Sequence, residues 1–296
     1  MNAALILPAR NEAECIEAVV REARQYFHGE IIVVDNGSTD ATAMRAAAAG
    51  ARVIHAPEPG YGRACMAGVT AAATCDVFVF MDADGSDCPE DIPALLAEID
   101  GGAALAIGVR TGERVAPGSI APAARLGNWL SGTLIGLWTG RRLKDLSPLK
   151  AVTREAIVTI EPSEMTYGWT VELLAGAARR KLAIAEVETS YRHRAGGTSK
   201  VSGTLSGSFR AGWRILSVLG RVGLRSLSAR MIGAAAGAAA AGGMLSVYTA
   251  WLFARGPSSD AVLVSTWLFA WPAILCGMLG GGAIGGVLSH GRQAGR

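Results

Sequence analysis

The first 110 residues alternate short apolar runs with helical patterns, and this alternation restricts the possible folds more than any other feature of the chain. The apolar runs are at 3–7, 31–34, 53–54, 77–81 and 105–109. Between them, apolar residues recur with the spacing of amphipathic helices. Strands that alternate with helices form a mostly parallel, Rossmann-like sheet. We therefore predict an α/β fold in which the polar turns after the strands meet at one edge of the sheet, where ligands bind.

A cluster of acidic residues follows the fourth apolar run. The run 77–81 ends at Asp82, and Asp84 and Asp87 follow it closely. Because side chains alternate along a strand, we expect Asp82 and Asp84 to point the same way. Neighbouring carboxylates repel each other unless a cation lies between them, and their hard oxygen atoms suit Mg²⁺ or Mn²⁺ with a diphosphate. The pair therefore predicts a metal–diphosphate site; alternatively, these acids only cap the helix that begins near Pro89.

Four motifs of this region, in this order and spacing, closely resemble family 2 glycosyltransferases with the GT-A fold. They are ILPARNEAE, VVDNGSTDAT, GYGRACMAG and FMDADGSDCPED. The resemblance implies that four residues bind the nucleotide base and ribose: Pro8, Arg10, Glu12 and Asp35. It also implies that Asp82 and Asp84 bind a divalent metal and the sugar nucleotide. Many members have a second Asp where this chain has Asn36, whose amide can still bond a base or ribose. Without the resemblance, Asp35 would equally well cap a turn.

The middle of the chain resembles the polyprenyl-phosphate sugar synthases, the branch that includes dolichyl-phosphate mannose synthase. Asp145 begins DLSPLK, which is similar to the D-x-x-S-G segment of that branch, with Pro148 where Gly is common. Glu172 lies in a segment that resembles the acceptor-side helix. The resemblance implies that Asp145 and Glu172 are catalytic residues near the acceptor. A phosphate acceptor is already ionised at neutral pH, so Asp145 either takes a proton or only orients the acceptor. Trp169 either stacks on a sugar or packs in the core.

A basic segment follows the strand pattern at 184–191. Its RHRAGGTSK sequence resembles the R-x-x-G-x-S-K segment of the same branch, which implies that Arg194, Ser199 and Lys200 bind phosphate. The same resemblance implies that Arg110 and Arg125 clamp either the donor diphosphate or the lipid phosphate. The alternative is a solvated basic loop.

Two uncharged stretches near the end of the chain predict a membrane anchor. Residues 231–254 and 261–289 carry no charge, and each exceeds the ~20 residues that span a bilayer. Residues 209–230 interleave arginines with aromatic and aliphatic residues, as an amphipathic helix at a membrane surface does. We therefore predict a GT-A domain over 1–208, an interfacial helix over 209–230 and a transmembrane hairpin over 231–296. The arginines flanking the hairpin predict a multi-pass protein of the inner cell membrane with a cytoplasmic catalytic domain.

Together these features predict an inverting, metal-dependent enzyme. It would transfer a sugar from a nucleotide sugar, of the UDP-glucose or GDP-mannose type, to a membrane lipid, with polyprenyl phosphate as the expected acceptor. The alternatives are another lipid or polysaccharide acceptor, or a membrane protein that binds nucleotide sugars without catalysis. We expect no nucleic-acid partner, and the Gly-rich spans are compatible with a homo-oligomer. The five cysteines show no CxxC spacing and predict neither a disulfide framework nor a zinc site.

Overall fold

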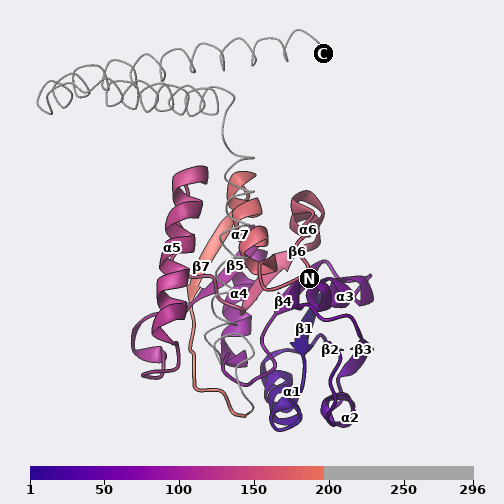
Figure 1. Ribbon diagram of the computed structural model, residues 1–296. Coiled ribbons are helices and arrows are strands. Elements are labelled where there is room, and N and C mark those ends of the chain that lie inside the picture. Colours follow the sequence, from indigo (N-terminus) through magenta and orange to yellow (C-terminus); the bar gives the residue numbers. More distant parts are fainter. Residues whose placement is uncertain (197–296) are drawn as a thin grey trace, which may run out of the picture. The chain divides into compact units, whose positions relative to one another are not determined.

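Seven strands form one mixed sheet within residues 1–196, the part of the chain that the computed structural model describes (Figure 1). Their order is β3-β2-β1-β4-β6-β5-β7. The strands are β1 (Ala3–Ala9), β2 (Glu30–Asp35), β3 (Arg52–His55), β4 (Val77–Phe80), β5 (Leu105–Val109), β6 (Lys150–Thr153) and β7 (Ile184–Glu188). All neighbouring strands pair in parallel except at β6, which is antiparallel to both β4 and β5. The prediction of a mostly parallel sheet is confirmed.

Helices cover both faces of the sheet. They are α1 (Ile16–Tyr26), α2 (Thr42–Ala48), α3 (Tyr61–Ala71), α4 (Ile92–Asp100), α5 (Pro122–Thr139), α6 (Arg154–Ile160) and α7 (Trp169–Arg179), with short 3-10 helices at Pro89–Asp91 and Gly112–Arg114. Alternate residues of β1 divide between two cores, as strand geometry requires. Leu5 packs with α1, α2 and α4, whereas Ile6 packs with α3, α6 and α7. Each strand of the centre is therefore buried on both faces.

Strand β6 is the strand that the sequence did not predict. It has only four residues, and it begins with Lys150, whose side chain is fully buried. A charged residue inside a short apolar run hides the strand pattern, because the pattern reports hydrophobicity and not pairing. The antiparallel register brings Lys150 opposite Phe80, the last residue of β4. This insertion places a lysine directly beside the acidic motif that follows β4.

The membrane-related predictions lie outside the described residues. These are the interfacial helix at 209–230, the two spans at 231–254 and 261–289, and the phosphate-binding residues Ser199 and Lys200. Within residues 1–196, every helix is too short or too polar to cross a bilayer.

Candidate active site

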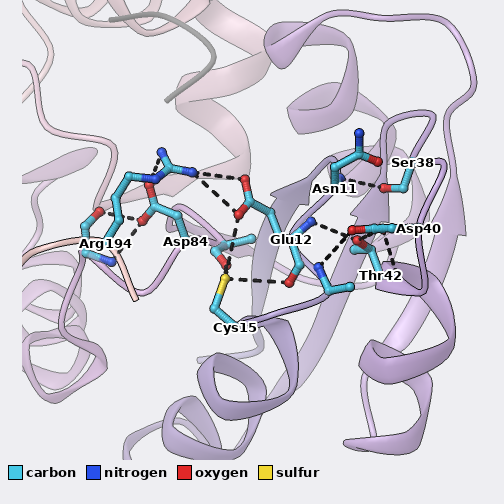
Figure 2. A network of polar contacts seen from close by, with 11 residues as sticks. Asn11, Glu12, Cys15, Ser38, Asp40, Thr42, Asp84 and Arg194 are labelled. Atoms are coloured by element: carbon cyan, nitrogen blue, oxygen red, sulfur yellow. Dashed lines mark hydrogen bonds and ion pairs between the residues drawn. The ribbon is translucent and has the colours of Figure 1, made fainter. Parts of the chain in front are cut away.

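The turns after β1 and β2 are bonded to each other at the carboxyl edge of the sheet (Figure 2). The backbone NH of Asn11 donates to Ser38 Oγ over 3.0 Å, and the NH of Glu12 donates to Thr42 Oγ1 over 2.9 Å. Asp35, the last residue of β2, accepts from the NH of Ser38 over 2.9 Å and is 8 % exposed. The predicted convergence of these polar turns is confirmed, because parallel strands end on the same side.

Glu12 and Asp84 share one arginine. Arg194 Nη1 lies 2.7 Å from Asp84 Oδ2, and Nη2 lies 3.2 Å from Glu12 Oε1 (Figure 2). The backbone NH of Ala195 also donates to the carbonyl of Asp84 over 3.0 Å. Two acids therefore meet one arginine, and the first of them, Glu12, is 182 residues from Arg194 in the sequence. The sheet brings these residues together, because the segment after β7 crosses the end of β4.

The buried thiol of Cys15 contacts the carboxylate of Glu12. Cys15 Sγ lies 3.6 Å from Glu12 Oε2 and 3.3 Å from the carbonyl of Ala83. Burial and the negative charge of Glu12 raise the pKa of Cys15 to about 12. The thiol thus stays protonated at neutral pH and can donate its one proton to either oxygen. Cys15 links the first motif to the acidic motif, a role that its sequence position did not suggest.

The side-chain amide of Asn36 forms its hydrogen bonds with the backbone of the protein. Its Nδ2 donates to the carbonyls of Ala56 and Glu58, each over 2.8 Å, and its Oδ1 accepts from the NH of Gly60 over 2.9 Å. The side chain thereby holds the loop between β3 and α3 against the end of β2. Sequence reasoning expected this amide to replace an Asp toward the nucleotide. The structure instead shows a structural bridge that needs an amide, since a carboxylate cannot donate to carbonyls.

Asp82 and Asp84 face different partners. Strand β4 ends at Phe80, so the strand alternation that would have aligned the two carboxylates does not extend to them. Asp84 contacts Arg194 and accepts from Ser86 Oγ over 2.6 Å. The backbone NH of Asp82 donates to Asp87 Oδ2 over 3.0 Å. Burial raises the pKa of Asp82, and repulsion by Asp87 and Asp84 raises it further.

Lys150 supplies the positive charge on the Asp82 side. Its Nζ donates to the carbonyl of Pro148 over 2.7 Å and lies 5.8 Å from the ring centroid of Trp169. Burial lowers its pKa to about 8, although Asp82 and Asp87 act in the opposite direction. Sequence reasoning missed Lys150 as a site residue; the available signal was a basic residue inside the apolar run 149–152.

These acids fit a single divalent cation completed by a ligand. Among the described residues, no three His, Cys, Asp or Glu side chains are arranged as a ready-made metal cage. Mg²⁺ does not require one, because it is commonly held by one or two carboxylates together with substrate phosphates. Burial raises the pKa of Asp82, and the negative charges of Asp87 and Asp84, which a cation would neutralise, raise it further. The donor set is therefore compatible with the predicted Mg²⁺ or Mn²⁺ at Asp82 and Asp84.

Asp145 is saturated with hydrogen bonds. Its Oδ2 accepts from Arg110 NH and Nε at 3.0 and 2.8 Å, and its Oδ1 accepts from Arg110 Nη2, Asn128 Nδ2 and Leu146 NH at 2.9, 2.5 and 2.7 Å. The ion pair is buried, with side-chain exposures of 9 % for Arg110 and 6 % for Asp145. The guanidinium also lies 4.9 Å from the ring centroid of Tyr191. The two residues thus form one rigid unit between β5 and the segment before β6.

Near the start of α7, Glu172 forms hydrogen bonds within the protein and Trp169 packs in the core. Glu172 accepts from the NH and Oγ of Ser163 at 2.8 and 2.9 Å and from the NH of Glu164 at 2.6 Å. Trp169 is fully buried, with its ring centroid 4.9 Å from that of Phe80, so it packs in the core and has no face for a sugar.

A glycine of the GYG motif is also explained by packing. A Cβ at Gly62 would lie 2.4 Å from the carbonyl of Glu164, so this glycine permits close backbone packing.

The remaining predicted residues are more dispersed. Pro8 lies in β1 and pairs with Val34, and Arg10 is exposed just beyond that strand. Arg125 is exposed on α5. The structure therefore brings together Glu12, Asp84 and Arg194, and separately Arg110 with Asp145.

Comparison with known proteins gives this geometry a family. Residues 4–158 match Glycosyl transferase family 2. An uncharacterized glycosyltransferase of Mycobacterium tuberculosis is 40 % identical over 223 residues, which cover 72 % of this chain and 97 % of that protein. A dolichyl-phosphate hexose transferase of Haloferax volcanii is 34 % identical over 200 residues, covering 66 % of this chain and 85 % of that protein.

A solved structure extends the match to the fold. Glucosyl-3-phosphoglycerate synthase from Mycobacterium tuberculosis, in complex with Mn²⁺, UDP-glucose and phosphoglyceric acid, aligns with a TM-score of 0.60 and 28 % identity. The alignment covers 75 % of this chain and 79 % of that one. The mixed, mostly parallel sheet is accordingly GT-A-like, as predicted. The order of the four motifs, the matched profile and the shared fold agree, and the chain belongs to glycosyl transferase family 2, whose members are nucleotide-sugar glycosyltransferases.

Proposed function

We propose that this enzyme transfers a hexose from a UDP- or GDP-sugar to polyprenyl phosphate, a lipid acceptor in the membrane. The observation that carries the choice of acceptor is the saturation of Asp145 by five donors, three of them from Arg110. A carboxylate with its lone pairs occupied and a cation beside it is a poor general base. A sugar hydroxyl needs such a base, whereas a phosphate acceptor arrives already ionised.

The second predicted acid of the acceptor side supports the same choice. Glu172 is held by three donors of the 163–164 segment, so it too orients a loop. With both acids in positioning roles, the acceptor oxygen itself supplies the nucleophile. It attacks the anomeric carbon as the nucleotide diphosphate leaves, and this single displacement inverts the configuration.

The donor side follows from the acidic motif. We assign Asp82 and Asp84 to one divalent cation, Mg²⁺ or Mn²⁺, which when bound neutralises charge on the departing diphosphate. Asp35 and Glu12, both buried at the carboxyl edge, are assigned to the nucleotide, together with Pro8 and Arg10. Arg194 adds positive charge beside Asp84. The Mn²⁺ and UDP-glucose bound by the structurally similar synthase support this assignment.

A soluble acceptor is the second candidate. The structure with a TM-score of 0.60 was obtained with phosphoglyceric acid, which carries a phosphate but offers a hydroxyl group to a sugar. The name of the Haloferax volcanii relative, a dolichyl-phosphate hexose transferase, supports the lipid instead. A hydroxyl acceptor requires a base whose lone pairs are free, whereas a lipid phosphate does not. The saturated hydrogen bonding of Asp145 therefore favours the lipid phosphate.

Transfer of labelled sugar from a panel of UDP- and GDP-sugars tests the proposal. The full-length chain would be assayed with Mg²⁺ or Mn²⁺ against undecaprenyl phosphate in detergent and, in parallel, against 3-phosphoglycerate. Asp84→Ala is the inactive control and Asp100→Ala, an exposed acid at the end of α4, is the matched one. Metal-dependent label in the lipid phase, lost only with Asp84→Ala, is the expected result. Label only in phosphoglycerate would overturn the proposed acceptor, and no transfer to either would redirect the search to other lipids.

A further inference from the structure

The outer face of α5 carries a stripe of large apolar side chains that the fold leaves uncovered. Among residues 1–196, nine large hydrophobic side chains are exposed, and four of them belong to this helix. They are Leu126, Trp129, Leu130 and Leu137, with exposures of 64, 56, 38 and 75 %. Single exposed apolar residues are common, whereas several on one helix face mark an interaction site. We call these four residues the α5 stripe.

Helix geometry makes the stripe continuous. Positions 129, 130 and 137 follow position 126 by three, four and eleven residues, and so all four lie on one side of an α-helix. At about 1.5 Å per residue the stripe is about 16 Å long. The opposite side packs against the domain through Ser131, Gly132 and Ile135, which are buried. A Cβ at Gly132 would lie 2.2 Å from the carbonyl of Leu143, so α5 is fixed in this orientation by close backbone contact.

The charged residues of the chain segment that contains the stripe are all basic. From Pro122 to Lys144 the chain has four basic residues, Arg125, Arg141, Arg142 and Lys144, and no acidic residue. All four are exposed. Two acids contact this segment: Asp145 accepts from Asn128 Nδ2 over 2.5 Å, and Glu186 accepts from the backbone NH of Lys144 over 2.7 Å. An apolar helix face flanked by exposed Arg and Lys is the pattern of helices that lie in the surface of an anionic membrane.

We infer that the α5 stripe docks onto the headgroup region of an anionic lipid bilayer. Charge decides between the possible occupants. A second copy of this chain would bring the same basic residues face to face. The segment 209–230 of this chain is itself rich in arginine, so it would be repelled in the same way. Anionic lipid complements the flanking arginines and also receives the Leu and Trp side chains. The inference does not depend on the proposed acceptor, since docking of this helix face onto lipid needs no substrate.

Fluorescence at two matched positions tests the inference. Leu137→Cys on the stripe and Val158→Cys on α6, 75 and 64 % exposed, would each be labelled with the environment-sensitive fluorophore NBD. The native cysteines of the described region are buried, and labelled wild-type protein gives the background. The full chain would be reconstituted into bilayer discs containing phosphatidylglycerol, or, if it does not insert, mixed with vesicles of the same lipids. Spin-labelled lipid and aqueous iodide would serve as the two quenchers.

The expected result is that lipid quenches NBD at position 137 and iodide does not, while position 158 behaves in the opposite way. In discs of phosphatidylcholine alone, or with Arg141→Gln and Arg142→Gln together, the docked-to-undocked ratio should fall by roughly tenfold or more. Equal iodide quenching at both positions would overturn the inference. Shielding of position 137 from both quenchers would overturn it as well, because it would show that protein covers the stripe.

Discussion

Arg194 lies against Asp84 at 2.7 Å, and the same guanidinium reaches Glu12 at 3.2 Å. The segment that follows β7 thus places a positive charge on the acidic motif at the end of β4. This arginine contacts an acid for which the resemblance implies a divalent cation. A metal ion that binds Asp84 must therefore compete with Arg194 or displace it.

Removal of this arginine should strengthen metal binding. We expect Arg194→Gln to tighten Mn²⁺ binding to the nucleotide-free protein by about threefold or more, since a partly screened ion pair is worth roughly 0.5–1 kcal/mol. Titration followed by Mn²⁺ electron paramagnetic resonance measures the change. The matched control is Arg192→Gln, because Arg192 pairs with Glu22 instead of Asp84. Unchanged Mn²⁺ affinity in Arg194→Gln would show that the arginine does not compete.

Replacing Asn36 by Asp should destabilise the protein even though many family members carry Asp at that position. The new carboxylate would face the carbonyls of Ala56 and Glu58 with no proton to donate. We expect a loss of about 1–3 kcal/mol in the free energy of unfolding, the usual cost of an unsatisfied buried polar group. Denaturant unfolding of Asn36→Asp measures it. Asn2→Asp, which removes one exposed bond to the carbonyl of Thr74, should cost much less; an equal loss would argue against the loop-bridging role.

Asp145→Asn distinguishes a positioning residue from a base. Removing one charge of the buried Arg110–Asp145 pair leaves the other uncompensated, and we expect a loss of about 3–5 kcal/mol in unfolding free energy. Thermal unfolding measures this loss, and the double variant Arg110→Met with Asp145→Leu should recover part of it. If Asp145→Asn were fully stable and yet inactive, the residue would be a base, and a hydroxyl acceptor would regain support.

The acidic motif should make stability depend on pH. The pKa of Asp82 rises from 3.8 in its ordinary state to about 8 in the folded protein, because of burial and of Asp87. Between these values the folded state binds more protons than the unfolded state, so the free energy of unfolding falls as pH rises. We expect that slope from about pH 4 to pH 8 in metal-free protein with EDTA, and a smaller slope in Asp82→Asn. Asp100→Asn, at an exposed position, should keep the wild-type slope; the same reduction there would contradict this cause.

The amino-acid sequence was sufficient for the chain's class and for its family. Apolar runs at 3–7, 31–34 and 77–81 became β1, β2 and β4, and the motif order matched the family profile. These features are local, because strand and helix patterns depend on residues a few positions apart. For the same reason the sequence alone places the acids at the ends of β2 and β4 at the ligand-binding edge.

Only the tertiary structure decided which charges meet. Arg110 and Asp145 are 35 residues apart in the sequence, and Arg194 and Glu12 are 182 apart. Their pairing therefore depends on the order and direction of the strands that lie between them in the sequence. The antiparallel insertion of β6 buries Lys150 beside Asp82, and the packing of Gly132 on Leu143 turns the apolar side of α5 outward. None of these contacts has a periodic signature in the sequence. Long-range electrostatic and packing partners are selected by the whole fold, because the free energy of each contact depends on the burial that the other elements provide.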